Sequence, residues 1–113
     1  PPRLFSCLAG FIEPGEAIAA CVRREVWEEA GIRVKSCQFY GDQPWPWPGQ
    51  LMLGCLAEAE YAEPVPDGEE LEEARWFTRS EILQILNRSH PGGISVPPPL
   101  AIAHSLIRTW GTA

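Results

Sequence analysis

The sequence predicts a single α+β domain, and three observations lead to this fold class. The chain has 113 residues, a length that fits one hydrophobic core. Hydrophobic residues make up 45% of the chain and charged residues are spread along it, as in a globular protein. Strand-like segments are interleaved with helical segments of unequal length, which favours an α+β sandwich over a doubly wound parallel sheet.

The first half of the chain predicts two strands and one helix. Residues 4–8 form a short apolar strand. A helix is expected over 17–30, because Gly31 is a typical residue just beyond a helix C-terminus. Residues 33–41 are rich in β formers, and the proline-rich segment 43–49 is expected to end this strand as a loop.

The second half of the chain predicts two strands and two helices. The strands are expected at 51–61 and 75–77. Thr78 and Glu81 have the spacing of a capping box, which predicts that a helix begins there. After a loop rich in glycine and proline, the last helix is expected over 99–110, ending before a glycine.

Charge and cysteine spacing exclude several classes of function. The net charge of −6 argues against a protein that grips nucleic acid by broad phosphate contacts. No apolar run approaches the ~20 residues that span a bilayer, and there is no signal peptide, so a cytoplasmic protein is expected. The cysteines form no C-x-x-C pair, which argues against a zinc site and favours free thiols. They are Cys7, Cys21, Cys37 and Cys55.

The informative helix carries three carboxylates on one face. Glu25, Glu28 and Glu29 stand at i, i+3 and i+4, where they repel one another. Hard cations such as Mg²⁺ or Mn²⁺ relieve this repulsion, because they take oxygen ligands. The alternative is a solvated charged face, with Arg23 and Arg24 pairing locally.

The spacing of the whole segment 10–32 decides between these readings, because it resembles the Nudix box at every defined position. The matching residues are Gly10, Glu16, Arg24-Glu25-Val26, Glu28-Glu29 and Gly31-Ile32.

This resemblance implies the Nudix fold, a mixed β-sheet sandwiched between α-helices, for residues 1–113. It also implies that Glu25, Glu28 and Glu29 hold Mg²⁺ or Mn²⁺, with the main-chain carbonyl of Ala9 as a further ligand. The family hydrolyses a nucleoside diphosphate linked to another moiety, using bound metals and an activated water. We assign Glu29 as the base that accepts the proton of this water, ahead of Glu28.

A rigid aromatic segment follows the box by ten residues. Alternating prolines stiffen the chain around Trp45 and Trp47, and rigid aromatics suit stacking on flat heterocycles. The alternatives are a proline-rich motif for SH3-like partners, or tryptophans that cap the core.

The same segment resembles the array Ser-Gln-Pro-Trp-Pro-Phe-Pro-x-Ser of NADH pyrophosphatases. Three positions depart from that array: Asp42, Trp47 and Gln50. The resemblance implies that the segment binds substrate through Gln43, Pro44, Trp45, Pro46, Trp47, Pro48, Gly49 and Gln50.

Further positions extend the resemblance over most of the chain. It implies that Glu70 is an additional metal ligand, although its acidic neighbours leave that choice open by a residue or two. It implies that Phe11 stacks on a base and that Ala103 contacts substrate. Glu16 and Arg24 are expected to be a structural pair that braces the loop against the helix.

The resulting hypothesis is an enzyme that hydrolyses NADH and NAD⁺ to nicotinamide mononucleotide and AMP. Removal of NAD caps from RNA ranks second, and hydrolysis of ADP-ribose ranks third. The alternative from another class is a truncated, non-catalytic module that binds a nucleotide.

The start of the chain predicts a fragment. It begins Pro1-Pro2 without Met, so we expect a longer parent protein, whose location could be peroxisomal or another organelle. The first strands of the Nudix sheet are expected to be missing. An exposed sheet edge would then favour pairing with a second copy as a homodimer.

Overall fold

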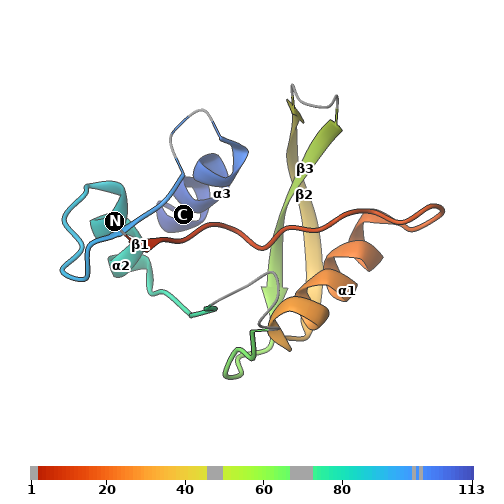
Figure 1. Ribbon diagram of the computed structural model, residues 1–113, viewed down its shortest axis with the longest axis horizontal. Helices are drawn as coiled ribbons and strands as arrows, with labels where there is room; N and C mark the ends of the chain where they lie inside the picture. Colours follow the sequence, from red (N-terminus) through yellow and green to blue (C-terminus); the bar gives the residue numbers. More distant parts are fainter. Residues whose placement is uncertain (1–2, 46–49, 67–72, 98, 100) are drawn as a thin grey trace. The chain divides into compact units, whose positions relative to one another are not determined.

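The computed structural model describes residues 3–45, 50–66, 73–97, 99 and 101–113. Their helices and strands give an α+β chain (Figure 1). In chain order the elements are β1 (Arg3–Leu4), α1 (Ile18–Ala30), β2 (Val34–Trp45), β3 (Gln50–Ala59), α2 (Arg79–Leu86), β4 (Ile94–Ser95) and α3 (Ile102–Gly111). None of the helices in the described part of the chain combines the length and apolarity needed to span a bilayer.

The chain divides into two compact units. Unit 1 contains Pro1–Cys7, Phe39–Gly54 and Phe77–Ala113, and unit 2 contains Leu8–Gln38 and Cys55–Trp76. The long strands β2 and β3 contribute residues to both units.

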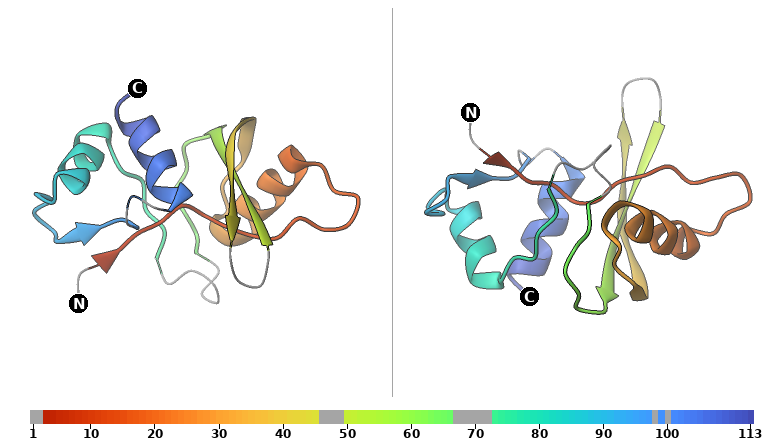
Figure 2. Two further views of the ribbon diagram at one scale, coloured as in Figure 1. Left: turned by 90° about the horizontal axis from the view of Figure 1, so that it is seen from above. Right: turned by 60° about the horizontal axis from the view of Figure 1, so that its bottom comes forward.

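Within the described residues the strands pair as two two-stranded sheets, not as the single mixed sheet that was expected. β1 pairs with β4 in parallel, with Arg3 opposite Ile94 and Leu4 opposite Ser95. β2 and β3 pair with each other as antiparallel neighbours and lie side by side in every view (Figures 1 and 2).

Unit 1 has a small apolar core around helix α2. Ile82 and Ile85 of α2 are buried with Ile94 of β4. The rings of Phe5 and Phe77 pack beside this cluster edge to face, with centroids 5.2 Å apart. Burial of these side chains fixes the short β1–β4 pair, which two residues of pairing alone would not stabilise.

Helix α2 begins at the predicted capping box. The Thr78 hydroxyl accepts from the Glu81 backbone N–H at 3.1 Å, and a Glu81 carboxylate oxygen accepts from the Thr78 backbone N–H at 3.1 Å. Two N–H groups that the helix cannot satisfy internally are thereby satisfied, which confirms the prediction.

Unit 2 is organised by helix α1, which ends where the sequence predicts. Gly31 has φ 68°, in the left-handed region that favours glycine, and its N–H donates to the Trp27 carbonyl at 2.9 Å. Ala30 and Ile32 are buried on either side of this turn. The Val65 N–H donates to the Ala30 carbonyl at 2.7 Å, so the last turn of α1 is also tied to a later segment.

Several predicted boundaries are wrong, and two of them concern strands. Residues 75–77 form no strand, because the Trp76 indole donates to the Ala62 carbonyl at 2.6 Å and its ring packs on Tyr61. The segment at 4–8 is a strand only at its start, in β1.

The other differences lie next to prolines and glycines. β2 continues through Pro44 to Trp45, where a loop was expected; a two-stranded sheet tolerates proline because each strand has an open edge. The glycine-rich segment 89–98 contains β4, and α3 begins at Ile102 rather than at 99.

Candidate active site

Helix α1 places its three carboxylates in different environments. The side chain of Glu28 is 56% exposed, that of Glu25 is 17% exposed, and Glu29 is buried with 3% of its surface exposed. A buried carboxylate is costly unless positive charge or hydrogen bonds compensate it. Glu29 is therefore the carboxylate of the three that the protein shields most from solvent.

Arg24 is the cationic centre of unit 2. Its Nη1 lies 2.7 Å from Glu25 Oε1 and 3.3 Å from Glu28 Oε2, so one nitrogen contacts two of the three carboxylates. Its Nε and Nη2 bind the two oxygens of Glu16 at 2.8 and 2.9 Å, the fork-to-fork geometry that suits arginine. Glu13 Oε1 lies 4.0 Å from Nη1.

This arrangement shifts the ionisation of both partners. Hydrogen bonds from Arg24, and then from the backbone of Glu13, lower the pKa of Glu16 to about 2. Hydrogen bonds to Glu16 and Glu25 raise the pKa of Arg24. Both groups are therefore charged at neutral pH, and the loop before α1 is held to the helix by an ion pair.

The loop that precedes α1 is fixed at its backbone. The Phe11 carbonyl accepts from Arg24 Nη2 at 3.0 Å and from the Cys21 thiol at 3.6 Å. The Phe11 side chain, in contrast, is 74% exposed. A held backbone with a projecting ring is a suitable arrangement for stacking on a flat ligand.

Gly10 lies in close contact with a predicted metal ligand. A Cβ at this position would collide with the carboxylate of Glu25. The glycine therefore allows the loop backbone to approach α1, and the exposed residue Ala9 directly precedes it.

The described residues contain no group of three or more His, Cys, Asp or Glu side chains arranged to hold a metal ion. Glu25 and Glu28 turn instead to the guanidinium of Arg24. The donor types still fit a hard divalent cation, because three carboxylates share one helix and one of them is buried. Glu70 lies outside the described residues.

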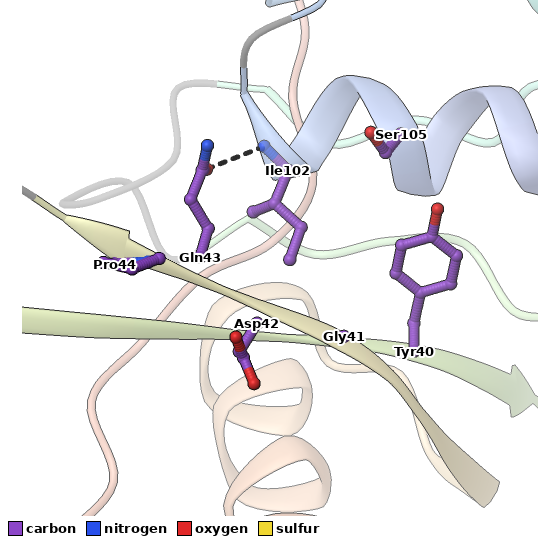
Figure 3. A pocket seen from close by; sticks show the side chains of 7 residues that line it. All are labelled: Tyr40, Gly41, Asp42, Gln43, Pro44, Ile102 and Ser105. Carbon is purple, nitrogen blue, oxygen red and sulfur yellow. Dashed lines mark hydrogen bonds between the residues drawn. The ribbon is translucent and has the colours of Figure 1, made fainter.

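Unit 1 contains a cavity of about 240 Å³ between the end of β2 and the start of α3 (Figure 3). The Gln43 side chain extends from β2 to the start of α3, and its Oε1 accepts from the Ile102 backbone N–H at 2.9 Å. The lining residues are Tyr40, Gly41, Asp42, Gln43, Pro44, Ile102 and Ser105.

The predicted substrate segment is described only at its start. Gln43 and Pro44 line the cavity, and Trp45 ends β2. The side chains of Trp45 and Gln50, and the whole of Pro46, Trp47, Pro48 and Gly49, lie outside the described residues. Ala103, half-buried in the first turn of α3, accepts from the Cys7 thiol at 3.8 Å through its carbonyl.

Sequence reasoning missed part of this arrangement. Tyr40, Ile102 and Ser105 line the cavity, yet none of them was singled out. The i, i+3 spacing of Ile102 and Ser105 beside Ala103 was an available signal, because those positions share a helix face. Nothing in the sequence indicated that Glu13 lies near Arg24.

The four cysteines are free thiols, as expected, and Cys21 is the buried one. Burial raises the pKa of Cys7 and Cys21. Burial and then the neighbouring thiols of Cys37 and Cys21 raise the pKa of Cys55 to about 11. These three thiols are therefore protonated at neutral pH and are poor nucleophiles.

Comparisons with known proteins agree with the motif. The family model described as NUDIX domain matches residues 1–95. The NAD-capped RNA hydrolase NUDT12 of Homo sapiens is 53% identical over 110 residues, covering 97% of this chain and 24% of that protein.

Two more distant organisms have similar relatives. An NAD-capped RNA hydrolase of Schizosaccharomyces pombe is 41% identical over 115 residues, covering 97% of this chain and 31% of that protein. The NAD-capped RNA hydrolase NudC of Chromobacterium violaceum is 42% identical over 107 residues, covering 95% of this chain and 36% of that protein. The chain thus spans between about a quarter and about a third of the length of these three curated relatives.

Proposed function

The chain belongs to the Nudix family, and we propose that it hydrolyses the pyrophosphate bond of NADH and NAD⁺, releasing nicotinamide mononucleotide and AMP. One observation carries the proposal: α1 holds a buried glutamate beside two glutamates that share a single arginine nitrogen. The printed names of the relatives support an NAD-containing substrate and make NAD-capped RNA a second substrate of the same site.

The family generally uses divalent metal ions, and we assign Mg²⁺ or Mn²⁺ to Glu25, Glu28 and Glu29, with the Ala9 carbonyl and Glu70 as additional ligands. When bound, such an ion neutralises pyrophosphate charge and acidifies a water. In this proposal Glu29 accepts the proton of the attacking water. Its burial keeps the carboxylate away from competing solvent.

Arg24 and Glu16 have a supporting role in this proposal. Because Glu16 occupies one edge of the guanidinium, Arg24 is held with Nη1 directed at Glu25 and Glu28. The two carboxylates are thereby oriented before any ion binds. The same guanidinium holds the Phe11 carbonyl, so the ring that we assign to base stacking starts from a fixed backbone.

Substrate choice is assigned to unit 1. Trp45 at the end of β2 and Ala103 in the first turn of α3 belong to segments that meet at the cavity. A partly apolar cavity of this kind suits the flat base of a dinucleotide.

The decisive experiment measures AMP release from NADH in the presence of Mn²⁺ or Mg²⁺. Glu29→Gln removes the proton acceptor with little change in volume, so we expect turnover to fall at least about a hundredfold. Glu63→Gln changes an exposed glutamate in the same unit and serves as the matched control. Equal activity of both variants would contradict the assigned base.

The alternatives are tested with the same assay. Trp45→Ala should reduce NADH turnover more than ADP-ribose turnover, because the aromatic segment is assigned to the nicotinamide dinucleotide; equal losses would make it structural. Absence of AMP from well-folded wild-type protein would favour the non-catalytic nucleotide-binding module.

A further inference from the structure

Helix α3 begins without a cap of its own. Its N-cap residue is Ala101, with φ −83° and ψ 139°, and no side chain caps the helix from that position. The first N–H groups of a helix have no acceptor within the helix and need one from elsewhere. The His104 N–H is satisfied locally by the Ala101 carbonyl at 3.1 Å.

The acceptor for the first helical N–H comes from β2. Gln43 Oε1 lies 2.9 Å from the Ile102 backbone nitrogen, although the two residues are 59 positions apart in sequence (Figure 3). Only the amide oxygen of glutamine can accept from an N–H, so this contact also fixes which way the carboxamide faces. Gln43 is half-buried, which shields the hydrogen bond from competing water.

Two further contacts hold α3 along the hairpin. A Cβ at Gly54 of β3 would lie 2.9 Å from Ile102 Cδ1 and 3.2 Å from Leu106 Cδ1, so the glycine allows a close approach. Near the other end of the helix, Thr109 Oγ1 donates to the Tyr40 hydroxyl at 3.2 Å. The Gln43 contact is the hydrogen bond to the first helical N–H of α3.

We propose that Gln43 is a positioning residue that caps α3 from a distance and sets the spacing between two substrate segments. Gln43 lies two residues before Trp45, and its partner Ile102 directly precedes Ala103. This hydrogen bond therefore ties the strand that leads into the aromatic segment to the helix turn that carries Ala103. In this proposal Gln43 acts through the position of α3, in place of the direct substrate contact that the resemblance implies. The kinetic consequence rests on the proposed function, whereas the cap does not.

Three variants separate capping from substrate contact. Gln43→Glu keeps an accepting oxygen at the same distance and places a negative charge at a helix N-terminus, where it is favourable, but it cannot donate. Gln43→Met keeps the length of the side chain and removes the acceptor. Gln43→Met combined with Ala101→Ser supplies a local cap without restoring the link to β2.

The first readout is hydrogen exchange at the Ile102 amide, which does not depend on activity. We expect exchange to become about tenfold faster in Gln43→Met and to remain near wild type in Gln43→Glu. Unchanged exchange in Gln43→Met would overturn the cap. This comparison is decisive even if the wild-type chain does not hydrolyse NADH, so failure of the proposed function is recognised separately.

The second readout is the division of the effect between KM and kcat for NADH. Gln43→Met should raise KM about tenfold and leave kcat within about threefold, because it leaves the glutamates of α1 unchanged. Gln43→Glu keeps the accepting oxygen, so its KM should rise less than that of Gln43→Met. If Gln43→Glu raised KM as much as Gln43→Met while the Ile102 amide stayed protected, Gln43 would contact substrate directly and the proposal would be wrong.

The double variant tests the link itself. We expect Ala101→Ser to restore the melting temperature of Gln43→Met but not its KM, because a local cap does not hold α3 to β2. If the melting temperature and KM both recovered, Gln43 would only stabilise the helix, and the proposal that it sets the spacing between β2 and α3 would be wrong.

Discussion

Replacing Gly10 with alanine tests whether the close approach of the loop to α1 sets the position of Glu25. The added Cβ would overlap three atoms of the Glu25 side chain. Because carbon atoms pack at about 3.5–4 Å, the carboxylate has to move by roughly 1 Å or more, and in doing so it strains its contact with Arg24. A misplacement of about 1 Å in a reacting assembly can lower the rate about a hundredfold. We therefore expect kcat/KM for NADH to fall about a hundredfold, or about 2.7 kcal/mol of transition-state stabilisation.

The assay combines steady-state AMP release with a direct titration of Mn²⁺ binding. The titration should show metal affinity about tenfold weaker or more, because disturbed ligand orientation typically costs that much. Glu63→Gln, which changes an exposed glutamate in the same unit, is the control. Melting curves establish that both variants fold.

A folded Gly10→Ala protein with activity and Mn²⁺ affinity within about threefold of wild type would refute the reasoning. It would mean that Glu25 is not held where it functions. Loss of activity with unchanged Mn²⁺ affinity would instead show that Glu25 is not a metal ligand and that the lost activity has another cause.

Three further predictions concern stability and thiol chemistry. The pKa of Glu16 falls from 4.5 to about 2 on folding, so its ionised form stabilises the protein above pH 4.5, and this contribution disappears as pH falls through about 2. In denaturant unfolding, the stability difference between wild type and Glu16→Gln should therefore shrink between pH 4.5 and about pH 2. A constant difference would count against the ion pair. Thr78→Ala should lower the free energy of unfolding by about 1 kcal/mol in urea titrations, whereas Thr78→Ser should not. If both variants lost the same free energy of unfolding, the hydroxyl would not cap α2. Cys55, with a pKa of about 11, should react with iodoacetamide at pH 8 about a hundredfold more slowly than an unfolded thiol. Mass spectrometry follows the labelling, and rapid labelling would show that the pKa of this thiol is not raised.

Local signals predicted much of the fold. The end of α1 at Gly31 and the start of α2 at Thr78 follow from backbone conformation and from capping, which involve residues close in sequence. The Nudix family was also predictable, because its motif is a fixed spacing on one helix and matches the family found by comparison.

Features that depend on distant residues were not predictable. β4 lies in a segment of glycines and prolines and becomes a strand only because β1 pairs with it. Trp76 is a residue type typical of strands, but its indole N–H donates to the Ala62 carbonyl in a loop. The burial of Glu29 and the contact of Gln43 with Ile102 likewise depend on which segments meet in the folded chain. The periodicity of apolar residues predicts helices and strands but not such tertiary contacts.

The parallel pairing of Arg3 with Ile94 has a consequence for the order in which the chain folds. Closing a loop of about 90 residues costs about 4 kcal/mol of chain entropy before any contact repays it. Helix α1 needs only neighbouring residues, so it can form within microseconds, whereas unit 1 has to gather three separated segments. We therefore expect completion of unit 1 to be the slow step of folding, so that substitutions at Phe5 or Ile94 change the folding rate as well as the final stability.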